Sequence, residues 1–180
     1  MNKFPIEHDL LFFASAKWQE TNKALRSFLH NYAQEDRVFF LEPPCFATCS
    51  ELSEYMQLTD IQPSICSVVP VLPRVSQQRE RIAMLQRILD RFLREQRVQD
   101  YLTWYTHPFG LSFSGHLEPF VTLYDCLNEA RLLSALSDEA LQLSAELIEC
   151  ADLVLLKRQG NMLYSDIYPF TSFISRKATK

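Results

Sequence analysis

Glycine is scarce in this chain of 180 residues, which contains three: Gly110, Gly115 and Gly160. The two common glycine-rich loops that bind phosphate, GxGxxG and the Walker A sequence, need several closely spaced glycines between a strand and a helix. Neither loop fits this sequence. Both of these devices for binding nucleotides are therefore excluded.

Long apolar runs are also absent, since no stretch approaches the 18 residues of a membrane-spanning helix. The N-terminus carries Glu7, His8 and Asp9 ahead of a short apolar run, which is unlike a signal peptide. We therefore expect a cytoplasmic protein, with peripheral contact at the inner face of the membrane as a further reading.

The five cysteines are odd in number and irregularly spaced, which is typical of free thiols in a reducing compartment. Cys45 and Cys49 have no second pair of ligands at a zinc-site spacing, while His116 and Glu118 are isolated. The sequence therefore predicts no metal site and no cofactor.

Positive charge is in deficit, because the net charge is −4 and the pI is about 5.6. General nucleic-acid binding is excluded, since it depends on clustered Lys and Arg. Residues 74–97 are a local exception, with seven arginines against three acidic residues. A solvated outer face of a helix is the favoured interpretation, and a membrane-surface or protein-docking face is the alternative.

Short apolar runs alternate with segments of helical periodicity. Strands are expected at residues 9–14, 37–41, 65–71, 101–105, 120–124 and 152–156, with a short seventh at 167–170. Helices are expected at residues 18–33, 51–58 and 77–96, and after a Ser137 cap. Because the strands are apolar on both faces, the pattern predicts one α/β domain over 1–180, a Rossmann-like three-layer sandwich with a mainly parallel sheet of about six strands.

Ligands bind such sheets beyond the carboxyl ends of the strands. The candidate substrate-binding residues follow the first, fourth and fifth strands: Lys17, Trp18, His107, Asp125, Asn128 and Glu129. An aromatic face with amide and carboxylate groups suits a sugar, but a purely structural role is equally compatible with these residues. His107 is interpreted as a locally packed loop histidine ahead of a general base, while Asp125 either orients a hydroxyl or caps a helix.

Several segments resemble, in order, a bacterial glycosyltransferase family with "RVFFVEEP"-like and "YDCMDE"-like motifs. They read DLLFFASAKW from Asp9, RVFFLEPP from Arg37, DYLTWYTHP from Asp100, YDCLNE from Tyr124 and ELIECADLV from Glu146. The resemblance runs from about residue 9 to residue 170. It implies a GT-B architecture without a bound metal, in which an N-terminal Rossmann-like domain receives the acceptor and a C-terminal one holds the nucleotide sugar.

Two departures from the family qualify what the resemblance implies. The sequence ends near the point where the family enters its second domain, so the donor-binding half is expected to be absent. Residues 19–26 replace an "RPQH"-like motif, and Asn128 replaces an acidic residue. The expected function is that of a glycosyltransferase-like domain, inactive alone, which acts with a partner polypeptide in polysaccharide or glycoconjugate synthesis.

The alternative is a non-catalytic interaction or scaffold protein derived from such a domain, and an excised domain with no role of its own is a third reading. A scaffold would carry an apolar patch on the face that the second domain once covered. The candidates for that patch are Phe109, Leu111 and Phe113.

Overall fold

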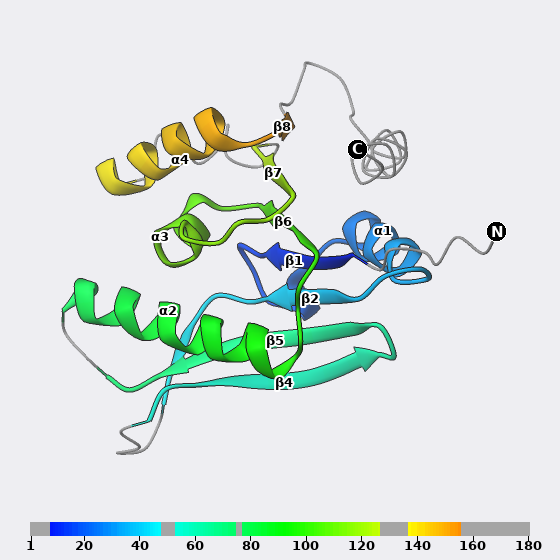
Figure 1. Cartoon of the computed structure of the whole chain (residues 1–180), viewed down its shortest axis with the longest axis horizontal. Helices are drawn as coiled ribbons and strands as arrows, with labels where there is room; N and C mark the ends of the chain where they lie inside the picture. Colours follow the sequence, from blue (N-terminus) through cyan, green and yellow to red (C-terminus); the bar gives the residue numbers. More distant parts are fainter. Residues whose placement is uncertain (1–7, 48–52, 75–76, 127–136, 156–180) are drawn as a thin grey trace.

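A computed structural model describes residues 8–47, 53–74, 77–126 and 137–155. One sheet forms the middle layer, with α1 on one face and α2, α3 and α4 on the other (Figure 1). The strands are β1 Asp9–Phe13, β2 Val38–Leu41, β3 Cys45–Phe46, β4 Tyr55–Gln62, β5 Ile65–Leu72, β6 Tyr101–Tyr105, β7 Val121–Asp125 and β8 Leu153–Leu155. The helices are η1 Trp18–Glu20, α1 Lys23–Tyr32, α2 Gln78–Glu95, η2 Pro108–Gly110, α3 Leu111–Ser114 and α4 Asp138–Cys150.

Six strands form the parallel centre of the sheet in the order β5-β2-β1-β6-β7-β8. Numbered along the chain, this is the 3-2-1-4-5-6 order of doubly wound folds. The predicted α/β class with a mainly parallel sheet is confirmed. The strand order reverses between β1 and β6, so this pair marks the point where ligands bind in such sheets.

The expected helix at 51–58 is wrong. Residues 55–62 form β4, which pairs antiparallel with β5 across a tight turn at Pro63 and Ser64. β3 and β4 both pair with Val71, so they flank β5 on opposite sides and β4 is the outer strand. Most residues of this edge strand are exposed, Gln57 and Thr59 among them, and Met56 is only partly buried. The strand therefore lacks the regular apolar alternation by which a half-buried strand is predicted. The predicted strand at 167–170 lies outside the described residues.

The sheet separates two hydrophobic cores, and β1 contributes to both. Leu10 and Phe12 point into the core beneath α1, while Leu11 and Phe13 point into the core beneath α2 and α4. This follows from the alternation of side chains along a strand. All five residues of β1 are buried, which explains its continuous apolar sequence.

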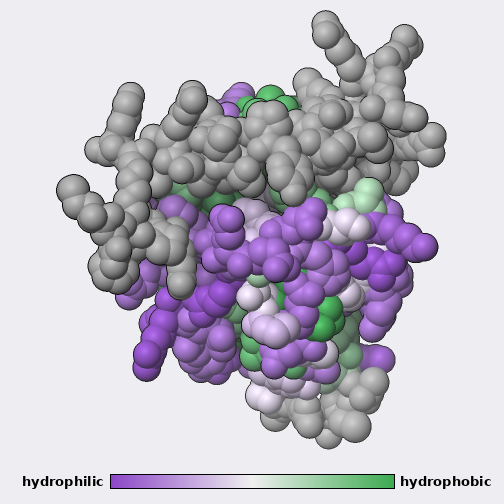
Figure 2. All heavy atoms as spheres, turned by 90° about the vertical axis from the view of Figure 1, so that its right-hand side faces the viewer, coloured by the Kyte–Doolittle hydropathy of each residue, from purple (hydrophilic) through white to green (hydrophobic). Residues whose placement is uncertain are grey.

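On one face of the sheet, α2 and α4 begin close to where the sequence predicts. Ser137 caps α4 through the Ala140 N–H, as expected. The expected helix at 18–33 is divided into η1 and α1, because Asn22 is extended and its side chain accepts the Leu25 N–H as a new cap. α2 matches its predicted range within one residue at each end. On the side of the molecule that carries α1, the described surface is mainly hydrophilic (Figure 2).

Candidate functional site

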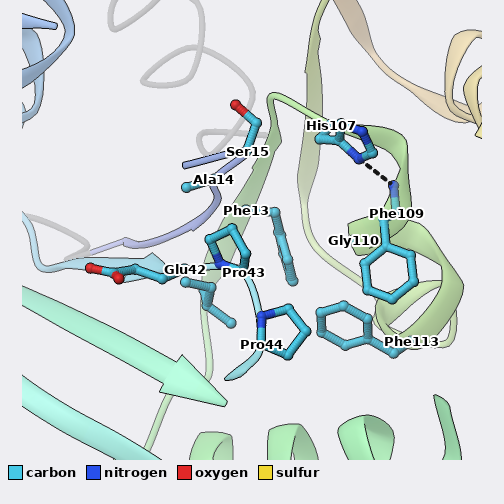
Figure 3. A pocket seen from close by; sticks show the side chains of 11 residues that line it. Phe13, Ala14, Ser15, Glu42, Pro43, Pro44, His107, Phe109, Gly110 and Phe113 are labelled. Carbon is cyan, nitrogen blue, oxygen red and sulfur yellow. Dashed lines mark hydrogen bonds between the residues drawn. The ribbon is translucent and has the colours of Figure 1, made fainter. Parts of the chain in front are cut away.

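A pocket of about 190 Å³ lies beyond the carboxyl ends of β1, β2 and β6, at the point where the strand order reverses (Figure 3). Its lining residues are Phe13, Ala14, Ser15, Leu41, Glu42, Pro43, Pro44, His107, Phe109, Gly110 and Phe113. Thr106 joins two of these strand ends, because its hydroxyl donates to the Phe13 carbonyl (3.1 Å) and accepts from the Ser15 N–H (3.0 Å). The pocket is therefore built on backbone that hydrogen bonds hold in place.

Three phenylalanine rings form one continuous wall of the pocket. Phe113 lies edge-on to Phe13, with ring centroids 5.9 Å apart, and is tilted against Phe109 at the same separation. Both geometries are favourable for aromatic pairs. The wall is thus a packed aromatic cluster whose members fix one another's positions.

Gly110 lets the loop after β6 approach this cluster. A Cβ at this position would lie 3.0 Å from the Tyr105 ring and 3.1 Å from the Phe13 side chain. Its backbone is right-handed helical, so space and not a positive φ demands the glycine. The close approach brings η2, and with it Phe109, over the end of β1.

His107 caps η2 at the mouth of the pocket. Its ring Nδ1 accepts the backbone N–H of Phe109 at 3.2 Å, drawn as a dashed line in Figure 3. Accepting at Nδ1 favours the neutral tautomer whose proton sits on Nε2. The imidazole thus has a defined structural role and also lines the site, as the sequence placed it.

Glu42 lines the pocket with its aliphatic stem only. Its Oε1 accepts the Ser67 hydroxyl at 2.7 Å and the Trp18 N–H at 3.1 Å. The carboxylate therefore points away from the phenylalanine rings (Figure 3). Its role is to tie the loop after β1 to β5.

The other residues predicted from the sequence do not converge on the pocket. Trp18 is 7% exposed and packs edge-on against Phe40 and His30, which corrects its expected place on the open rim. Lys17 is exposed but is not among the lining residues, and Asp125 is buried at the end of β7, 1% exposed. Asn128 and Glu129 lie outside the described residues.

The patch expected at Phe109, Leu111 and Phe113 is also corrected. Phe113 is 4% exposed, and the other two are half-buried against the core that contains it. Phe109 and Phe113 line the pocket, while Leu111 packs against the core, so the three residues do not form an open apolar face. Sequence reasoning missed Phe13 as a lining residue, because the search for site residues began after each strand end and Phe13 is the last residue of β1.

The arginine-rich face of α2 is partly engaged within the chain. Arg87 binds the Glu54 carboxylate at 2.9 Å, and Arg91 donates to the Glu54 carbonyl at 2.9 Å. The hydrogen bond from Arg87 lowers the pKa of Glu54 below its ordinary value. These contacts join α2 to the segment just before β4.

Among the residues that the structure describes, no group of three or more His, Cys, Asp or Glu side chains is arranged to hold a metal ion. The same residues contain no helix with the length and apolar character needed to cross a membrane. Burial raises the pKa of the Cys66 and Cys150 thiols, which disfavours the nucleophilic thiolate at both positions.

No family model and no curated protein matches the chain. Among solved structures, it is similar to an α,α-trehalose-phosphate synthase (UDP-forming) from Burkholderia xenovorans, crystallised in complex with glucose-6-phosphate. The identity is 10% and the TM-score 0.45, and the match covers 82% of this chain. The chain spans 40% of the length of that protein.

Proposed function

We propose that this domain binds the acceptor in a glycosyl transfer reaction of polysaccharide or glycoconjugate synthesis. The observation that carries the proposal is the position of the pocket. It lies at the reversal point of a 3-2-1-4-5-6 sheet, where ligands of such folds bind. Its lining begins at the ends of β1, β2 and β6, which lie in three of the segments that carry the resemblance to the glycosyltransferase family, and continues into Phe109, Gly110 and Phe113 just after the third of these segments.

The reaction joins an acceptor oxygen to the anomeric carbon of the donor sugar, while the nucleotide leaves and the hydroxyl proton passes to a base. In this proposal a second Rossmann-like unit, on a partner polypeptide or another domain, holds the nucleotide sugar. His107 orients the acceptor at the pocket mouth. None of the pocket residues of this chain is proposed as a catalytic residue.

The test is a transfer assay on the native assembly. The chain is tagged in its own cells and purified with its partners, then supplied with radiolabelled nucleotide sugars and a cell extract as the source of acceptor. We expect label to be transferred by the assembly and not by the isolated chain, with at least a tenfold loss in a Phe109→Ala variant.

Tyr55→Ala is the matched control, because it removes an exposed aromatic ring from β4, outside the pocket. Transfer that is equally fast in the wild type and both variants would contradict the assignment of the pocket. An assembly that forms normally and transfers no sugar would favour the scaffold alternative.

A further inference from the structure

The distribution of polar atoms in the pocket is uneven. Phe13, Phe109, Phe113 and Pro44 surround one end, and Ser15 and His107 stand at the other (Figure 3). A ligand that matches this pocket has an apolar body and a polar end.

The wall opposite the phenylalanine rings offers no backbone donor to the oxygens of a sugar. Pro43 and Pro44 form it, and proline has no backbone N–H to donate. The nearest carboxylate, that of Glu42, is turned away and already accepts from Ser67 and Trp18. A sugar ring placed here would lose the hydrogen bonds that water donates to its oxygens without regaining them from this wall, at a cost in free energy.

The volume sets the size of the occupant. An apolar protein cavity of about 150 Å³ is large enough for a benzene molecule. Pockets that enclose whole drug-sized ligands usually begin at about 300 Å³. At about 190 Å³, this pocket admits one ring or a short branched chain, while the rest of the ligand stays outside.

We propose that the pocket receives an apolar group of the acceptor, of the size of a phenyl ring, with the hydroxylated part of the acceptor at the Ser15 and His107 end. This inference rests on the proposed function for the identity of the ligand as an acceptor. It adds the chemical class: the acceptor is an aryl or alkyl alcohol or glycoside, bound through its aglycone.

The test compares three probes by calorimetry on the full chain. They are methyl β-D-glucopyranoside, phenyl β-D-glucopyranoside and benzyl alcohol, which separate the sugar from the apolar group. We expect phenyl glucoside to bind at least about tenfold more tightly than methyl glucoside, because it buries a ring in the apolar end. Benzyl alcohol is expected to compete with phenyl glucoside for the same site.

Variants then locate the site. Phe109→Ala removes one ring of the aromatic wall and is expected to weaken phenyl glucoside binding at least fivefold, while Tyr55→Ala leaves it unchanged. Phe109→Leu keeps an apolar wall and serves if the alanine variant does not fold, with a smaller loss expected.

The outcomes separate this inference from the proposed function. Equal affinity for methyl and phenyl glucosides, or no binding of any probe by the folded chain, overturns the apolar assignment and leaves the transfer assay to judge the function. If the assembly binds benzyl alcohol and phenyl glucoside tightly but transfers no sugar, the apolar pocket is upheld. The same result would contradict the proposed function.

Discussion

The rings of Phe13 and Tyr105 are stacked across neighbouring strands, with centroids 4.6 Å apart and planes 10° from parallel. The two residues are register partners in β1 and β6. Gly110 lies so close to both rings that a Cβ there would stand 3.0–3.1 Å from them and would have to displace them slightly. The stacked pair thus sets how closely the loop after β6 approaches β1, and so where the wall of the pocket stands.

Replacing Gly110 with alanine tests this relationship. The new Cβ would press on the Tyr105 and Phe13 side chains, so we expect the free energy of unfolding to fall by about 1–3 kcal/mol, measured by urea titration. Gly115→Ala is the matched control, since Gly115 is exposed and its nearest crowding atom is one carbonyl oxygen of Leu111. Similar losses in the two variants would count against a tight approach at Gly110.

Tyr105 makes the free energy of unfolding depend on pH in the alkaline range. Burial raises the pKa of its phenol to about 12, above the ordinary value of about 10 that it regains on unfolding. The contribution of Tyr105 is therefore fully present below pH 10 and declines as the pH rises through 12. Urea titrations between about pH 9 and 11 are expected to show stability falling less steeply in Tyr105→Phe than in the wild type.

The same substitution has a cost at neutral pH. It removes a buried hydrogen bond of 2.7 Å to Ser114, which we expect to lower the free energy of unfolding by about 1 kcal/mol. Burial also raises the pKa of Tyr32 and Tyr101, and these groups act equally in both proteins. Identical slopes against pH in the two proteins would show that Tyr105 ionises normally in the folded state.

The ion pair between Arg37 and Asp9 anchors the start of β1. Two hydrogen bonds of 2.7 and 2.6 Å join the guanidinium to a carboxylate that is 8% exposed. Arg37→Ala leaves that carboxylate buried without its cation, so we expect a loss of about 2 kcal/mol in the free energy of unfolding. Arg87→Ala breaks a more exposed pair and is expected to cost less than about 1 kcal/mol. The reverse ranking in thermal or urea unfolding would refute this account.

We expect nucleotides to have no effect on the thermal stability of the chain. The turn from β1 to α1 has no glycine, and the Leu25 N–H at the start of α1 is already bound by Asn22. A ligand at a hundred times its dissociation constant would stabilise the fold by about 2.7 kcal/mol. We expect no thermal shift with UDP, GDP or their sugar derivatives, and a shift with phenyl glucoside as the positive control. A thermal shift with a nucleotide would instead indicate that this domain itself binds the donor.

The fold was predictable where one physical signal dominated. Strands buried on both faces produced continuous apolar runs, and the helix at 78–95 carried an apolar stripe that a period of 3.6 residues reveals. β4 gave no such signal. Its Tyr55 and Leu58 are exposed, and the strand forms because it pairs with β5. A pattern of residues within β4 alone cannot predict that pairing.

The location of the site could be predicted from the sequence, but only some of the residues that line it could. The strand-end rule led to His107, because that residue follows β6 directly. It also led to Trp18, whose ring turns inward to pack on Phe40 in the core beneath α1. The pocket depends on how three separate strand ends meet in space, and that arrangement is decided by packing across the sheet.

The division of β1 between two cores limits how this domain can change over evolutionary time. Deleting one residue inside Asp9–Phe13 would send Phe12 and Phe13 to each other's side of the sheet and misplace both sets of contacts. Insertions and deletions among homologues are therefore expected in the loops on either side, while the length of β1 stays constant. A gap placed within β1 in an alignment of such sequences would mark an error in the alignment.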